Sequence, residues 1–262
     1  MLCINECLTE DTKILLIGKK KFSFFKRKEE PKIFRKNFNH AEFIGEEICA
    51  SKEMPCVHFF LVADGFFTSN QMTTYCLLPK HVSRIEIGSC DFRKHDYEYF
   101  SIVHGNVTSE DDCLIPLLEM APSEKNRQEL LNEILNMLAL DTYMGQIDRF
   151  HNNIVFERNP KTKEIHLSPL FDFEYSLKSS YLDPDSIYPN PIYPLFTIKD
   201  YRRMIEIFPE FKEKLESFLS IKLVDAATFA YQSKGLVMPS CKLPFYHDFD
   251  KRQKKLIRKI IE

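Results

Sequence analysis

The fold of this chain is predicted most directly by Gly145-Gln-Ile-Asp148-Arg-Phe-His-Asn-Asn153, followed by Ser168-Pro-Leu-Phe-Asp172-Phe-Glu. An aspartate and an asparagine stand five residues apart in the first stretch, and an aspartate ends an apolar run in the second. Phosphoryl transfer uses such groups, because one carboxylate orients the attacking hydroxyl while an amide oxygen and another carboxylate hold Mg²⁺. Hard oxygen ligands suit Mg²⁺, which binds through few protein groups. The pattern therefore predicts a phosphotransferase site with Asp148, Asn153 and Asp172 as its catalytic residues.

The residues around Asp148 predict a helix, a loop and a hairpin. Residues 123–144 carry apolar side chains at helical spacing, with Ser123 as the N-cap and Gly145 as the stop. Residues 153–157 and 164–168 alternate like two strands joined by a turn. Because that hairpin brings its ends together, we expect Asn153 and Asp172 to converge as ligands of one metal ion.

The same two stretches resemble the bacterial HipA-like kinases and, more distantly, the phosphatidylinositol kinases. The resemblance lies in Gly-x-x-Asp-Arg-x-x-x-Asn and Leu-x-Pro-Leu-Phe-Asp, and its close part covers residues 141–177. Asp172-Phe-Glu stands where protein kinases carry Asp-Phe-Gly. The resemblance implies an α+β, two-lobed protein-kinase-like fold, with a small β-rich N-lobe (residues 1–80, with one helix) and a mainly helical C-lobe (residues 81–262). It also implies ATP and Mg²⁺ as cofactors.

The strand expected over residues 32–36 would carry the cation that holds the nucleotide phosphates. Aligned with the family pattern, Arg35 takes the lysine position, and Lys36 lies one residue further on. Neighbouring residues of a strand point to opposite faces, so only one of the two can meet the phosphates. Both stay open, with Lys36 slightly ahead because the family uses lysine at this point.

A helix expected over residues 40–54 places Glu42 in its first turn, where the resemblance implies a carboxylate that pairs with the phosphate-binding cation. Glu46 and Glu47 are alternatives for that role. The adenine hinge is expected over residues 76–80, with backbone contacts from Cys76 and Leu78. Residues 84–104 show no clear pattern, and we expect an extended segment or an insertion there.

The composition is that of an ordinary globular protein. The chain has 262 residues and a formal net charge of −2, so no overall basic field favours nucleic acid. No apolar run has the length that spans a bilayer, and the N-terminus lacks the pattern of a secretion signal. The eight cysteines are scattered without a zinc-site spacing. These features predict a cytoplasmic protein without membrane or direct nucleic-acid contacts.

The resemblance implies a serine/threonine-protein kinase with a protein substrate. HipA proteins are toxins of toxin–antitoxin pairs, so an antitoxin-type partner is a further expectation, although this chain lacks room for their usual additional N-terminal domain. A small-molecule or phosphoinositide kinase stays open, because the Asp-Arg-x-x-x-Asn loop occurs there too. A pseudokinase that binds nucleotide or a partner without transfer also stays open. It is favoured by the absent glycine-rich loop, the unsettled lysine and Glu174 in place of glycine.

Overall fold

The computed structural model describes residues 13–17, 20–25, 34–37, 39–57, 59–63, 82–87, 97–103, 113–149, 153–178, 195 and 197–262. The strands are β1 (Lys13–Ile17), β2 (Lys20–Phe25), β3 (Phe34–Asn37), β4 (Phe59–Ala63), β5 (Val82–Ile87), β6 (Glu98–Val103), β7 (Phe156–Arg158) and β8 (Ile165–Leu167). The helices are α1 (His40–Ser51), α3 (Leu114–Leu118), α4 (Glu124–Met144), α5 (Ile198–Ile207), α6 (Glu210–Phe218), α7 (Leu223–Ser233) and α8 (Leu243–Ile261), with a 3₁₀ turn η5 (Ser240–Lys242). The chain is therefore α+β, as predicted.

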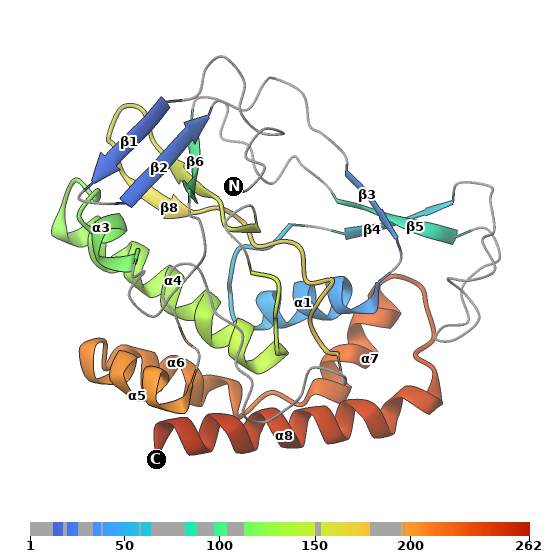
Figure 1. Ribbon diagram of the computed structural model, residues 1–262. Helices are drawn as coiled ribbons and strands as arrows, with labels where there is room; N and C mark the ends of the chain where they lie inside the picture. Colours follow the sequence, from blue (N-terminus) through green and yellow to red (C-terminus); the bar gives the residue numbers. More distant parts are fainter. Residues whose placement is uncertain are drawn as a thin grey trace.

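The strands form two antiparallel sheets, which Figure 1 shows above the helices. One has the order β1-β2-β6-β7-β8, and the other has the order β3-β5-β4. In the first sheet β6 pairs with β2 on one side and with β7 on the other. The N-terminal strands thus share a sheet with the β7–β8 hairpin, which lies between Asn153 and Asp172. The division of the chain at residue 80 stays a prediction.

Helix α4 contacts β8, α3, α6 and α8, while α1 packs against α7. Every residue of α4 from Met137 to Met144 is buried, as expected of a helix enclosed on all sides. Helix α8 lies along the far side of α4 from the first sheet, and α1 lies between α7 and the β3-β5-β4 sheet (Figure 1). Within the described residues, no helix is both long enough and apolar enough to cross a membrane.

The predicted elements around Asp148 are confirmed. Ser123 caps α4 by accepting a hydrogen bond from the N–H of Asn126, and Gly145 ends the helix in the left-handed conformation with φ of 60°. The hairpin forms as β7 and β8. The helix expected over residues 40–54 is α1, which ends earlier, at Ser51. Two strands, β5 and β6, lie in the stretch for which the sequence showed no pattern.

Candidate active site

The loop after α4 is anchored by a buried ion pair between Arg149 and Asp141. Nε and Nη2 of Arg149 donate to the Asp141 carboxylate over 2.9 to 3.2 Å, and Nη1 donates to the Phe171 carbonyl over 2.6 Å. Burial raises the pKa of the Asp141 carboxyl, and Arg149 opposes that rise. Burial also works against the charge of Arg149, but its neighbours, Asp141 foremost and Asp172 after it, outweigh burial and raise the pKa of the guanidinium. Arg149 therefore stays charged and joins the end of α4 to the segment before Asp172.

Asp148 and Asn153 belong to one closed loop. The Asn153 amide nitrogen donates to the Asp148 carbonyl over 2.8 Å. The amide oxygen of Asn153 is the atom that this side chain can offer to a cation, because the amide nitrogen is only a hydrogen-bond donor. Asn153 is buried, whereas Asp148 is half-buried. The intervening residues 150–152, which include His151, lie outside the described part of the chain.

Gln146 connects this loop to Asp172. Its side-chain oxygen accepts from the backbone N–H of Asp148 over 3.2 Å, and its side-chain nitrogen donates to the backbone carbonyl of Asp172 over 2.6 Å. The side chain is almost completely buried, with 8% of its surface exposed. One amide thus fixes the spacing between the backbones of the two aspartates, a function that the sequence analysis did not assign to Gln146.

The segment that carries Asp172 is held from both sides. On one side, Arg149 donates to the Phe171 carbonyl and Gln146 donates to the Asp172 carbonyl. On the other side, Glu42 on α1 accepts from the N–H of Phe173 over 2.8 Å. Asp172 has φ of 63°, a left-handed conformation that aspartate tolerates better than most residues. The main chain of this segment is therefore fixed by side chains from the loop after α4 and from α1.

The Phe173 ring fills the space between α1 and β4. A Cβ atom added to Gly45 would lie 2.6 Å from the ring, so only glycine allows α1 to approach this closely. The ring makes an edge contact with Phe59 at 6.5 Å between centroids, and the Arg149 guanidinium lies 5.2 Å from its centre. This packing sets the position of the residues on either side of Phe173.

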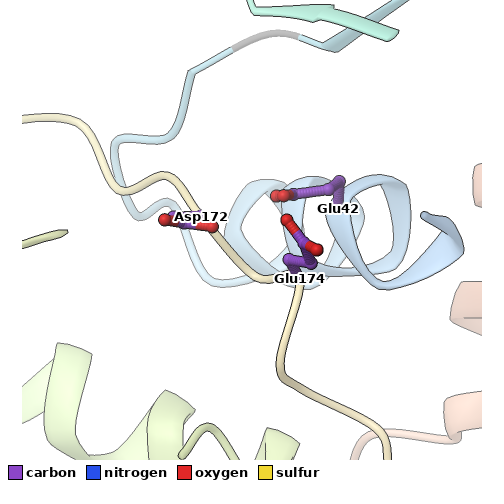
Figure 2. A group of neighbouring side chains, drawn as sticks. All are labelled: Glu42, Asp172 and Glu174. Atoms are coloured by element: carbon purple, nitrogen blue, oxygen red, sulfur yellow. The ribbon is translucent and has the colours of Figure 1, made fainter. Parts of the chain in front are cut away.

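Those neighbours, Asp172 and Glu174, form a carboxylate cluster with Glu42 (Figure 2). Ligand oxygens of the three side chains lie within 4.8 Å of one another. Glu42 is fully buried, and the other two are half-buried. Carboxylate oxygens at this spacing are the donor set that a hard divalent cation prefers. The three residues therefore fit a magnesium or manganese ion.

Solved structures share the arrangement of these elements. The Helicobacter pylori proinflammatory kinase CtkA matches with a TM-score of 0.51 and 17% identity, over 97% of this chain and 94% of that one. HipA of Shewanella oneidensis MR-1, solved with HipB and operator DNA from its toxin–antitoxin system, matches with a TM-score of 0.52 and 11% identity. This chain has the fold of the HipA-like kinases. At these identities, the likeness concerns the fold alone.

The HipA-like fold extends over most of the described elements, since the match to HipA covers 94% of this chain. The chain spans 62% of the length of that HipA protein. No protein-family model and no curated protein sequence matches the chain. The resemblance predicted from residues 141–177 is thus confirmed by the three-dimensional arrangement, and the site residues themselves stay predictions.

Within the HipA-like fold, the structure places some of the predicted site residues together and leaves others undescribed. Asn153 donates a hydrogen bond to the Asp148 carbonyl, and carboxylate oxygens of Asp172 and Glu42 lie within 4.8 Å of each other. Arg35 and Lys36 lie on β3, where they are paired with Glu86 and Ile85 of β5, but their side chains lie outside the described part. The choice between them therefore stays open. The hinge residues, Cys76 and Leu78, lie outside the described part entirely.

In the sequence, Glu174 is only a departure from Asp-Phe-Gly, and its position near the other two carboxylates is not predicted. The available signal was its spacing, because Glu174 follows Asp172 by two residues and can reach the same space. Its backbone carbonyl accepts from the Asn39 amide over 2.7 Å, which fixes the main chain at this residue. The N-cap residue of α1 thus holds Glu174 beside Glu42.

Proposed function

We propose that this chain is an ATP- and Mg²⁺-dependent phosphotransferase, a HipA-like serine/threonine protein kinase that transfers the γ-phosphate of ATP to a protein hydroxyl. We further propose that it is two-lobed, with the nucleotide between a strand-rich part, up to about residue 80, and the helical remainder. The observation that carries the proposal is the link made by Gln146 between Asp148 and Asp172. That link ties the backbone of the residue that would orient the acceptor to the backbone of the residue that would hold the metal.

The metal would be held by Asp172 and by the amide oxygen of Asn153. The donor chemistry fits Mg²⁺, since both are hard oxygen ligands and carboxylates surround Asp172. When bound, the ion neutralises charge on the nucleotide phosphates. The hydrogen bond from the Asn153 nitrogen to the Asp148 carbonyl would help to hold the amide group in place.

Asp148 would orient the acceptor hydroxyl and accept its proton. The hydroxyl oxygen forms a bond to the γ-phosphorus as the bond between that phosphorus and the bridging oxygen breaks, which releases ADP. Lys36 or Arg35 would hold the phosphates, and Glu42 would set the position of that cation. Cys76 and Leu78 would contact adenine through their backbone groups.

The partners follow from the acceptor and from the HipA-like fold. The acceptor is a serine or threonine of a protein substrate, in a cytoplasmic setting. The HipA structure contains HipB of the same toxin–antitoxin system, which supports an antitoxin-type protein partner for this chain. Membrane binding and direct nucleic-acid binding are not part of the proposal.

Thermal unfolding with and without Mg-ATP tests nucleotide binding, because a ligand that binds only the folded state raises its stability. Phosphoproteomics then tests the acceptor, by comparing cells that express the wild-type chain with cells that express Asp148→Ala. The exposed Asp248→Ala on α8 is the matched control. We expect phosphosites that are present with wild type and the control and absent with Asp148→Ala.

A pseudokinase is the second candidate function, favoured by Glu174 in place of the usual glycine. It would give a large Mg-ATP-dependent rise in the unfolding temperature, but no phosphosite lost in Asp148→Ala. That result would contradict the transfer step and leave the nucleotide-binding fold in place.

A further inference from the structure

We propose that Glu174 is a carboxylate ligand of the same divalent ion as Asp172, and that this added ligand lets the site bind the ion before any nucleotide arrives. The inference rests on the proposed function, which places an ion at Asp172. It goes beyond that function by assigning a metal-binding role to Glu174. The usual Asp-Phe-Gly sequence has glycine at this position, and glycine has no side chain to bind a metal.

The geometry of Glu174 supports its assignment. A carboxylate oxygen of Glu174 lies within 4.8 Å of oxygens from both Asp172 and Glu42, a spacing at which one cation can contact oxygens from more than one side chain. In Figure 2 the Glu174 side chain lies beside that of Glu42, and Asp172 precedes Glu174 on the same segment of the chain. Both residues sit on a backbone fixed by hydrogen bonds, Asp172 through Gln146 and Glu174 through Asn39. The two carboxylates are thus placed before a metal binds.

The charge of the cluster supports the binding of an ion without nucleotide. Three carboxylates with oxygens close to one another attract a divalent cation without help from nucleotide phosphates. Glu42 is fully buried, so water screens its charge poorly. Mg²⁺ sites that use nucleotide commonly combine one or two carboxylates with the substrate phosphates. A further carboxylate reduces the dependence of the site on those phosphates.

The inference is tested by titrating Mn²⁺ into the full chain without nucleotide. The electron paramagnetic resonance signal of the free ion measures how much Mn²⁺ is bound. We expect wild type to bind Mn²⁺ with a Kd of roughly 0.1 mM or tighter, within the range of oxygen-ligand sites. Glu174→Gln keeps the size and polarity of the side chain but removes its charge, and should weaken binding about tenfold or more. Asp172→Asn should weaken binding at least as much. The exposed Glu206→Gln on α5 carries the same substitution away from the cluster and should bind like wild type.

Thermal unfolding of the same variants separates loss of a ligand from loss of the fold. Without metal, Glu174→Gln should unfold near the wild-type temperature, because the substitution keeps the size and polarity of the side chain. With Mn²⁺, its unfolding temperature should rise less than that of wild type, in proportion to its weaker binding. The assignment would be contradicted if Glu174→Gln lowered the unfolding temperature without metal but showed the same rise with Mn²⁺ as wild type. Glu174 would then stabilise the fold without binding the ion.

The outcomes distinguish this inference from the proposed function. If Asp172→Asn weakens binding and Glu174→Gln does not, the assignment of Glu174 is wrong while the metal role of Asp172 stands. If wild type binds no Mn²⁺ until ATP is added, nucleotide-independent binding is wrong and the phosphotransferase proposal is unaffected. If Mn²⁺ binds wild type and both variants equally, the ion lies elsewhere, and both the inference and the metal role of Asp172 fail.

Discussion

Glu42 on α1 accepts a hydrogen bond over 2.8 Å from the backbone N–H of Phe173, although 131 residues separate the two in the sequence. The carboxylate is fully buried, and this contact satisfies one of its oxygens inside the protein. Because Phe173 lies between two of the clustered carboxylates, the position of α1 determines how the three groups are arranged. The site therefore depends on the packing of α1 as well as on the loop after α4.

Gly45→Ala tests this dependence, because the new Cβ would lie 2.6 Å from the Phe173 ring. Overpacking costs about 1–3 kcal/mol, whereas replacing glycine by alanine within a helix recovers up to about 1 kcal/mol. We expect a net loss of about 1–2 kcal/mol in the free energy of unfolding, measured by urea denaturation. Phe173→Leu in the same chain should recover part of that loss. A neutral Gly45→Ala would mean that the ring can shift without cost.

Arg149→Met removes the cation from the buried ion pair with Asp141. Asp141 has only 8% of its surface exposed. Loss of one partner from a buried pair typically costs about 3–5 kcal/mol, because the remaining charge has no partner. We expect a loss of that size in urea denaturation. Adding Asp141→Leu should restore part of the stability, since neither charge of this ion pair is then left without its partner. Equal stability of the single and double variants would contradict this account of the pair.

Gln146→Met keeps a similar side-chain volume and removes the side-chain hydrogen bonds to the backbones of Asp148 and Asp172. We expect a modest loss of stability, about 1–3 kcal/mol, because two neutral hydrogen bonds are lost. Phosphate transfer should fall further, by about 100-fold in kcat, because misplacement of reacting groups by about 1 Å has effects of that size. Gln128→Met, on the exposed surface of α4, is the matched control. An unchanged kcat in Gln146→Met would show that the two aspartates are positioned without this amide.

His40 makes the stability of the protein depend on pH. Burial and the neighbouring Lys242 lower the pKa of His40 to about 3, and its ring packs edge-on against Tyr246. In the unfolded chain the pKa is about 6.5, so the folded state favours the neutral ring. The stabilising contribution is complete above pH 6.5 and is lost as the pH falls toward 3. Between pH 7.5 and 5, this loss amounts to at most about 2 kcal/mol.

Urea denaturation at those two pH values measures the loss. His40→Gln should show a smaller difference between pH 7.5 and 5 than wild type, because its side chain does not titrate. An identical pH dependence in the two proteins would mean that His40 becomes protonated without disturbing the N-terminal end of α1.

The sequence predicts local features well where the physical cause is itself local. Ser123 and Gly145 mark the ends of α4 because a serine side chain can cap the first turn and glycine tolerates φ of 60°. The hairpin of β7 and β8 follows from alternation over a few residues. The HipA-like fold follows from the spacing of the two motifs, which reflects the order of helix, loop, hairpin and aspartate.

Features that depend on distant partners were not predicted. Strand β6 gains its hydrogen bonds from β2 and β7, which come from distant parts of the chain, so its own residues carry a weak signal. The contact between Glu42 and Phe173 joins two segments that no sequence pattern relates. Glu174 looked like a loss of function beside Asp172, because its position relative to Glu42 becomes visible only once α1 and the loop are packed together.

The central claim is that Asp148 and Asp172 serve phosphate transfer. The most direct test measures γ-phosphate transfer from labelled ATP, together with Mg-ATP binding, in Asp148→Asn and Asp172→Asn. We expect Asp148→Asn to bind Mg-ATP like wild type and to lose transfer by about 100-fold or more, because acid–base catalysis by one side chain contributes that much. Asp172→Asn should lose both transfer and Mg²⁺-dependent ATP binding. Wild-type transfer rates in both variants would contradict the account, since neither carboxylate would then serve the reaction.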